Sequence, residues 1–256
     1  MKKNQIKEKL AAGKPVYGTM VQFPDADLVE MLGYAGFDWI LIDAEHGSIN
    51  ENDCAAMVRA CELANTTSIV RPPSNHPETI LRFLDRGAQG VQVPHVNTAE
   101  DARAVVEAVK YYPVGTRGVT SSTRSANYGF RESIPDYIKF SNAETFVCVM
   151  IEEHEAVRNL PEILKVEGVD VFFVGAGDLA QSMGFPGNKN TPEVQKVVHE
   201  ALDAILGAGK VAGLSCDEEH MTAFVRRGVR YFHTGVTPLM KFATRHFWSL
   251  VGEQRG

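Results

Sequence analysis

The chain has 256 residues, of which 44% are hydrophobic and 23% are charged, a composition typical of a folded globular protein. Its formal net charge of −6 at pH 7, without a clustered basic stretch, argues against a nucleic-acid-binding protein, because phosphate contacts need a basic surface. No apolar run approaches the roughly 20 residues of a membrane-spanning helix, and the charged N-terminal segment lacks the apolar core of a signal peptide. We therefore expect a cytoplasmic protein with no nucleic-acid or membrane partner.

The four cysteines, Cys54, Cys61, Cys148 and Cys216, include no C-x-x-C pair. Cys54 and Cys61 on one helix would lie about 10 Å apart, which is too far for a disulfide. We expect all four to be reduced and mostly packed in the interior, with neither a disulfide nor a thiolate–metal site.

After an N-terminal helix, short β-branched or aromatic runs alternate with longer amphipathic segments, and each pair fills roughly 25 to 35 residues. The pattern predicts eight strands, at residues 16–20, 39–42, 68–70, 90–93, 146–151, 171–174, 211–214 and 231–233. Helical stretches follow them, among them residues 51–63, 77–86, 98–109 and 192–206. Eight such pairs in about 250 residues predict a (β/α)₈ barrel, with a doubly wound open sheet as the alternative. No composition shift divides the chain, so we expect residues 1–256 to form a single domain.

One connection, residues 111–131, is unusually long. A loop of about 20 residues in a compact fold is usually either a functional lid or disordered. Arg117, Arg124 and Tyr128 within it favour a lid.

Three predicted strands end in acidic residues, at the rim where parallel-sheet enzymes keep their chemistry. Asp43 and Glu45, with His46 beside them, follow the strand at 39–42. Glu152 and Glu153 follow the strand at 146–151, and Asp178 follows the strand at 171–174. An acid after a strand is often only the N-cap of the next helix. Three such ends together indicate a hard-metal site with a histidine base beside it.

Glu152 and Asp178 are the predicted metal ligands. Mg²⁺ and similar ions are commonly held by one or two carboxylates, and these two follow consecutive strands, which are neighbours in a barrel. Glu153 competes with Glu152, but it lies one residue further on and suits the first turn of the next helix. The N–H groups of the turn at 175–178 could bind a substrate carboxylate, although a tight turn with an Asp cap explains the same sequence.

His46 is the predicted general base, because an imidazole titrates near neutral pH and a carboxylate partner would orient it. Asp43 and Asp85 are both candidates for that partner. Arg71 ends the third strand before two prolines, where its guanidinium would balance the charge of an enolate or carboxylate. His95 and His233 also end strands and rank below His46 for a direct role.

A Schiff-base mechanism would need a lysine inside the barrel or at the active end of a strand. None of the twelve lysines meets this need; Lys210, for example, precedes the seventh strand, at the opposite end. A P-loop and a nucleophile elbow are also absent from the sequence. Metal-assisted enolate chemistry remains.

Six segments, at residues 37–46, 70–73, 93–96, 112–118, 150–152 and 174–179, carry a resemblance to a known family. They resemble the metal-dependent class II pyruvate aldolases of the HpcH/HpaI family, such as those acting on 4-hydroxy-2-oxoheptane-1,7-dioate and 2-dehydro-3-deoxyglucarate. The resemblance implies a (β/α)₈ barrel, a divalent ion (Mg²⁺, Mn²⁺ or Co²⁺) and a hexamer built from three dimers that exchange C-terminal helices. It also implies reversible cleavage of a 4-hydroxy-2-oxo acid into pyruvate and an aldehyde.

Carried onto matching positions, the resemblance makes His46 the base, Asp85 the residue that raises its basicity, and Arg71 the group that stabilises the transition state. The binding residues that it implies are Glu152 and Asp178 for the metal, and the N–H groups of Gly177 and Asp178 for the pyruvate carboxylate.

The chain departs from the family pattern at two places. Met150 stands where glutamine is common, and it lacks an amide that could hydrogen-bond the substrate. Gly175-Ala-Gly-Asp replaces the usual Gly-Pro-Ala-Asp turn. These departures keep open a lyase or decarboxylase acting on another 2-oxo acid, a carbon–carbon bond-forming synthase of the same superfamily, or a non-catalytic metabolite-binding barrel.

Overall fold

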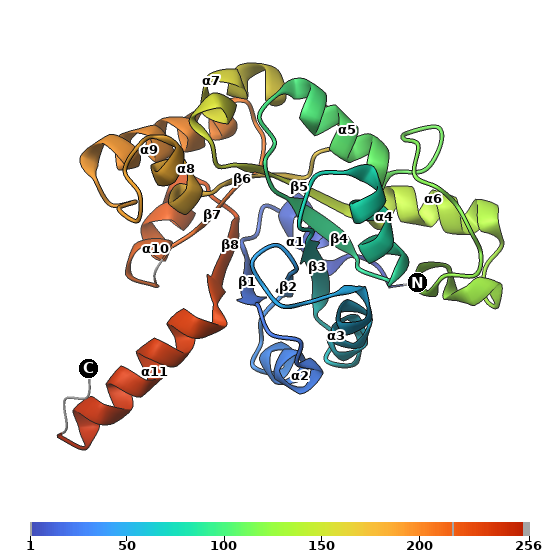
Figure 1. Cartoon of the computed structure of the whole chain (residues 1–256), viewed down its shortest axis with the longest axis horizontal. Coiled ribbons are helices and arrows are strands. Elements are labelled where there is room, and N and C mark those ends of the chain that lie inside the picture. The colour runs from blue at the N-terminus through green and yellow to red at the C-terminus, as the bar shows by residue number, and fades with distance from the viewer. Residues whose placement is uncertain (1, 217, 253–256) are drawn as a thin grey trace.

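Eight parallel strands close into a barrel in which the order of the strands follows the chain, and helices surround it (Figure 1). The computed structural model describes residues 2–216 and 218–252. The strands are β1 (Val16–Val21), β2 (Trp39–Asp43), β3 (Thr67–Arg71), β4 (Gly90–Val93), β5 (Phe146–Ile151), β6 (Val171–Val174), β7 (Ala212–Ser215) and β8 (Tyr231–Gly235). The predicted (β/α)₈ barrel is confirmed, and the open sheet is excluded because β8 pairs with β1.

The helices alternate with the strands along the chain. They are α1 (Gln5–Ala11), α2 (Ala26–Tyr34), α3 (Glu51–Leu63), α4 (Pro77–Asp85), α5 (Ala99–Val109), the 3₁₀ helix η1 (Arg124–Gly129), α6 (Ile134–Glu144), α7 (His154–Ile163), α8 (Ala176–Ser182), α9 (Pro192–Gly207), α10 (Glu218–Arg227) and α11 (Val236–Leu250). Capping residues fix the N-termini of two of these helices: Asn50 forms a capping box with Asp53 at the start of α3, and Thr98 forms one with Asp101 at the start of α5.

Side chains from alternate positions of the strands fill the inside of the barrel. The largest fully buried ones include Trp39, Phe146 and Tyr231, whose rings stack on one another with Tyr231 in the middle. Because this aromatic layer blocks the interior, a substrate can reach the barrel only at its ends. The polar residues that end the strands therefore lie at an accessible mouth.

Cys54, Cys61 and Cys148 are buried, in agreement with the expectation that the cysteines are mostly packed in the interior. Within the described residues, no helix is long and apolar enough to span a membrane.

The last helix, α11, projects away from the barrel (Figure 1). None of its residues is buried, and Met240, Phe242, Phe247 and Leu250 are each more than half exposed. Its apolar side chains are therefore not covered by the barrel of the same chain.

Candidate functional site

Arg71 and Asp43 form a buried ion pair at the mouth of the barrel. They are partners in the β2–β3 register, and two hydrogen bonds join them, from Nε to Oδ1 (2.9 Å) and from Nη2 to Oδ2 (2.7 Å). Burial by itself would raise the pKa of Asp43, but the hydrogen bonds and charge of Arg71 hold that pKa below its ordinary value. The arginine is thus fixed at the end of β3, where the sequence analysis expected a cation.

The same aspartate shapes the turn that carries His46. Its Oδ1 accepts hydrogen bonds from the backbone N–H groups of Glu45 (3.2 Å) and His46 (3.3 Å). The Glu45 side chain points back to Arg71, with 3.1 Å between Oε2 and Nε. The His46 side chain is 59% exposed, and its Nε2 lies 3.9 Å from Glu45 Oε2, so the predicted base is open to substrate.

Glu152 is the buried acid of the mouth, at only 2% exposure. Its Oε1 accepts a hydrogen bond from the backbone N–H of His95 (2.9 Å), whereas its Oε2 is buried with no hydrogen-bond partner among the described residues. Burial, together with the nearby carboxylates of Glu45 and Asp178, raises the pKa of Glu152 to about 7. A buried carboxylate oxygen without a partner fits a site for a cation.

Glu45, His95 and Glu152 each offer a ligand atom, and these atoms all lie within 4.8 Å of one another. His95 has a φ of 57°, a left-handed conformation that helps turn its N–H toward Glu152. Its ring lies between two further acids, with Nε2 3.3 Å from Glu45 Oε1 and Nδ1 3.0 Å from Glu153 Oε1, and the hydrogen bond to Glu153 raises its pKa. From the sequence, Glu45 was one of the acids that indicate a metal site but was not chosen as a ligand, and His95 ranked below His46. Their positions directly after strands were the only sequence signal for both.

Asp178 lies in the first turn of α8, directly after β6. Its charge is close enough to raise the pKa of Glu152, although it is not one of the three residues grouped by distance. Gly177 beside it is exposed, with no atom within 4 Å of where a Cβ would lie. The N–H groups of a first helical turn have no partner within the helix, so this surface can accept an anionic group.

A family model described as HpcH/HpaI aldolase/citrate lyase matches residues 18–240. The chain belongs to this family. It is 38% identical over 253 residues to a protein named 4-hydroxy-2-oxo-heptane-1,7-dioate aldolase from Shigella sonnei (strain Ss046), and 98% of this chain and 96% of that protein are covered. The predicted family and the predicted enzyme class, an aldolase-type lyase, are therefore confirmed.

Solved structures agree with this assignment. A crystal structure of an HpcH/HpaI aldolase/citrate lyase family protein from Burkholderia cenocepacia J2315 matches with a TM-score of 0.91 and 30% identity, covering 98% of this chain and 100% of that chain. The structure of citrate synthase SbnG matches with a TM-score of 0.84 and 29% identity, covering 96% and 98%.

In this HpcH/HpaI family chain, Asp85 is not brought near His46. Asp85 is the last residue of α4, which runs from the mouth back toward the start of β4. Its Oδ1 accepts a hydrogen bond from Arg117 Nη2 (2.8 Å) at that far end. Within one chain, Asp85 therefore cannot be the carboxylate partner of His46. It can tune the basicity of His46 only if the two residues come from different subunits.

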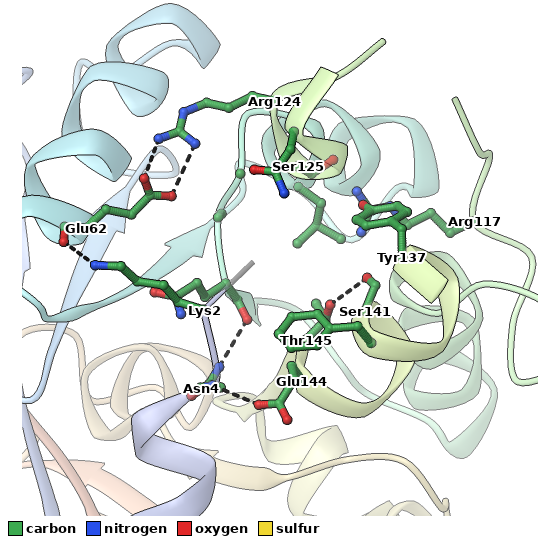
Figure 2. Close-up of a pocket in the computed structure, with 16 residues that line it drawn as sticks. Lys2, Asn4, Glu62, Arg117, Arg124, Ser125, Tyr137, Ser141, Glu144 and Thr145 are labelled. Atoms are coloured by element: carbon green, nitrogen blue, oxygen red, sulfur yellow. Dashed lines mark hydrogen bonds and ion pairs between the residues drawn. The ribbon is translucent and has the colours of Figure 1, made fainter. Parts of the chain in front are cut away.

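The long loop also lies away from the mouth of its own barrel. Arg124 pairs with Glu62 near the C-terminal end of α3, at 2.6 and 3.1 Å, and Arg117 is buried beside Tyr137 of α6. These residues line a pocket between the ends of α3 and α4, η1 and α6 (Figure 2). The predicted lid therefore does not cover the site of the same chain.

Proposed function

We propose that the protein is a divalent-metal-dependent aldolase that reversibly cleaves a 4-hydroxy-2-oxo acid into pyruvate and an aldehyde. The observation that carries this proposal is the combination, at one barrel mouth, of a fixed Arg71 and a buried Glu152 whose Oε2 lacks a hydrogen-bond partner. The names of the relatives point to the same chemistry. We also infer that residues 1–256 form one domain, since the strands of the barrel are drawn from almost the whole chain.

Glu152 and Asp178 would hold the ion, with Glu45 as the competing ligand. Carboxylate oxygens suit Mg²⁺, Mn²⁺ or Co²⁺, and the mutual repulsion of these acids is relieved by a cation. Glu45 is already 3.1 Å from Arg71, whereas no cation of the described residues pairs with Glu152 Oε2, which favours Glu152 as the principal ligand. A bound divalent ion would supply Lewis acidity to the 2-oxo group.

The protein's own residues would perform the proton transfers and charge stabilisation. His46 takes the proton of the 4-hydroxyl, the C3–C4 bond breaks, and the aldehyde leaves. The electron pair of that bond passes toward the 2-oxo group, and C3 then gains a proton to give pyruvate. Arg71 stabilises the negative charge on the pyruvate part, and the N–H groups of Gly177 and Asp178 bind its carboxylate.

We further propose that the active enzyme is a hexamer built from dimers that exchange their C-terminal helices. The exposed apolar side chains of α11 support this assembly, because an uncovered apolar face is stabilised by a partner subunit. In such an assembly, Asp85 of one subunit would act on His46 of another, since one chain keeps them apart.

A Schiff-base route has no support in the described residues. Lys110 is the buried lysine, and burial lowers its pKa to about 8. Its ammonium donates hydrogen bonds to the carbonyl oxygens of Asn142 (2.9 Å) and Thr145 (2.6 Å), beside the start of β5 and away from the mouth. We propose a cytoplasmic location, because the buried thiols of Cys54, Cys61 and Cys148, which form no disulfide, suit a reducing compartment.

Pyruvate release from a panel of 4-hydroxy-2-oxo acids, measured before and after chelation, tests the proposal. Chelation should abolish turnover, and added Mn²⁺ or Co²⁺ should restore it. Full activity in a metal-free sample would refute the metal-dependent mechanism.

His46→Ala tests the base, with oxaloacetate decarboxylation as an internal control. Metal-assisted decarboxylation needs no proton from a 4-hydroxyl, so it should survive better than aldol cleavage, whose kcat should fall ~10²–10⁴-fold. Equal losses in both reactions would mean that His46 supports binding of the ion or of pyruvate.

A carbon–carbon bond-forming synthase is the second candidate, favoured by the likeness to a citrate synthase and by Met150 at the glutamine position. Product analysis separates the two functions. Pyruvate and aldehyde formed from a hydroxy-oxo acid identify an aldolase, and condensation products without pyruvate identify a synthase.

A further inference from the structure

His233, near the end of β8, forms part of the floor of the mouth. It points into the barrel, where its ring stacks on Phe173 (centroids 4.9 Å apart, planes at 8°) and meets the edge of Trp39 (5.8 Å, 88°). Tyr231, two residues earlier on the same face of β8, fills the barrel beneath it. The 7% of His233 that stays exposed therefore faces the mouth.

Two glycines on the neighbouring strands make room for this arrangement. A Cβ on Gly213 of β7 would lie 3.0 Å from Phe173 and 2.8 Å from Tyr231, so its absence lets Phe173 reach across β7 to His233. A Cβ on Gly18 of β1 would lie 2.2 Å from the Trp39 indole. The imidazole is thus held between two aromatic rings, a fixed position that does not depend on a hydrogen bond.

Only one nitrogen of the ring has a hydrogen-bond partner among the described residues. Nδ1 lies 3.4 Å from the backbone oxygen of Thr234, and because a carbonyl only accepts, this contact assigns the ring proton to Nδ1. Nε2 has no hydrogen-bond partner in the part of the chain that the structure describes, and it is left as an acceptor. Burial lowers the pKa of His233 to about 4, with the charge of Arg71 acting in the same direction, so the ring is neutral near pH 7.

The position of β8 identifies the part of the substrate that His233 faces. Arg71 ends β3, Glu152 follows β5, and the turn with Gly177 follows β6, so the groups assigned to the pyruvate part occupy the half of the mouth from β3 to β6. In the closed barrel, β8 lies between β7 and β1, on the opposite side from β4 and β5. His46, which takes the proton of the 4-hydroxyl, follows β2, and only β1 separates β2 from β8, so the aldehyde part of the substrate is expected to extend toward this second half.

We propose that His233 is a substrate-binding residue that accepts, through Nε2, a hydrogen bond from a hydroxyl on the aldehyde part of the substrate, and so selects hydroxylated aldehydes. This inference rests on the proposed aldolase function. An apolar aldehyde would leave the Nε2 acceptor unpaired in a mostly buried position, which is unfavourable, whereas a hydroxyl satisfies it.

The test compares two aldehydes of similar size, glycolaldehyde and propanal, in condensation with pyruvate by the metal-loaded enzyme. We expect kcat/KM for glycolaldehyde to exceed that for propanal by about 10-fold or more, the usual effect of one buried hydrogen bond. His233→Phe keeps a ring that can stack but removes the acceptor, so it should lower kcat/KM for glycolaldehyde by a larger factor than kcat/KM for propanal. His233→Gln, which keeps an acceptor, is the matched control and should retain part of the preference.

Wild-type enzyme that uses both aldehydes equally well would overturn the inference without using any variant, so it stays testable if His233→Phe does not fold. Equal losses with both aldehydes in a folded His233→Phe enzyme would also overturn it, because they would indicate a packing role only. A wild-type enzyme that forms no aldol product with either aldehyde would instead refute the proposed function.

Discussion

Arg71 lies between two carboxylates, those of Asp43 and Glu45, while Oε2 of the buried Glu152 has no hydrogen-bond partner among the described residues. This asymmetry matters, because a buried cation that is already paired stays fixed during a reaction and stabilises new negative charge without rearranging. The unpaired acid, in contrast, gains most from a bound ion. In the proposed chemistry, Arg71 thus stabilises negative charge as a cation that is already paired and fixed, whereas Glu152 acts by binding the ion.

Arg71→Lys tests the role of the fixed cation. Lysine keeps the charge but cannot form the two parallel hydrogen bonds to Oδ1 and Oδ2 of Asp43, so the cation loses its fixed position. We expect kcat to fall ~10²–10³-fold. Steady-state kinetics with a 4-hydroxy-2-oxo acid measure this, and unchanged kcat and KM would show that the side chain is peripheral.

His233 gives the stability of the protein a defined pH dependence. Its pKa is lowered from 6.5 to about 4 in the folded chain, so between these values the unfolded chain binds a proton that the folded chain does not. The free energy of unfolding therefore falls as pH falls, and this group alone contributes about 2 kcal/mol of loss between pH 7 and pH 5.

Urea unfolding of wild type and His233→Phe at both pH values isolates this contribution. Other groups contribute equally to both proteins, so the variant should lose about 2 kcal/mol less on acidification, whatever its absolute stability. Identical losses would mean that the imidazole is protonated in the folded protein near pH 5.

At this scale the sequence predicted which residue types lie at the mouth, but not how they pair. The order strand, then acid, placed Asp43, Glu152 and Asp178 correctly on the rim, because side chains that end parallel strands must meet there. The contacts of Glu45 and His95 depend on the turns that follow β2 and β4. Those turns are shaped by hydrogen bonds to Asp43 and Glu152 that no local pattern reveals.

At the scale of elements, the turn between β6 and α8 connects the metal site to the substrate site. A Cβ on Gly175 would lie 2.7 Å from the Cβ of Glu152, so a side chain there displaces the proposed ligand. Two residues later, Gly177 has open space at the same position. A side chain at Gly175 should therefore disturb Glu152, whereas a side chain at Gly177 should not.

Gly175→Ala should weaken Mn²⁺ binding about 10- to 100-fold, as expected when the support of a ligand is disturbed. Gly177→Ala is the control and should bind Mn²⁺ as the wild type does, because its new methyl group contacts nothing in the protein. Calorimetric titration of chelated enzyme measures both. Equal affinity in all three proteins would show that Glu152 is not a ligand.

The elements themselves were largely predictable. β4, β5 and β6 begin and end at the predicted residues, because a strand buried on both faces reads as a continuous apolar run. β7 was predicted at residues 211–214 and is observed one residue later, at Ala212–Ser215, where small residues give a weak signal. The loop at 111–131 was misjudged, since its arginines contact the ends of α3 and α4 rather than the mouth.

At the scale of the whole molecule, one chain leaves two features without a partner. The apolar side chains of α11 are uncovered, and Asp85 lies at the far end of α4 from the histidine that it is expected to tune. The sequence alone does not show that α11 and Asp85 lack these partners within one chain, because it does not distinguish contacts within a subunit from contacts between subunits. A single assembly in which subunits share their sites would account for both features.

Mixing two inactive variants tests that assembly. In a mixture of His46→Ala and Asp85→Asn chains, a site that combines His46 from one chain with Asp85 from the other is intact. Random exchange in a symmetric oligomer should restore about a quarter of the wild-type sites. His46→Ala mixed with Arg71→Lys is the control: both residues belong to the mouth of one chain, so no such recovery is expected.

Sedimentation verifies that the chains associate, and mass spectrometry verifies that the two variants exchange subunits. If activity does not recover in mixed oligomers, Asp85 does not act across the interface, and a monomer at micromolar concentration would refute the exchange of α11.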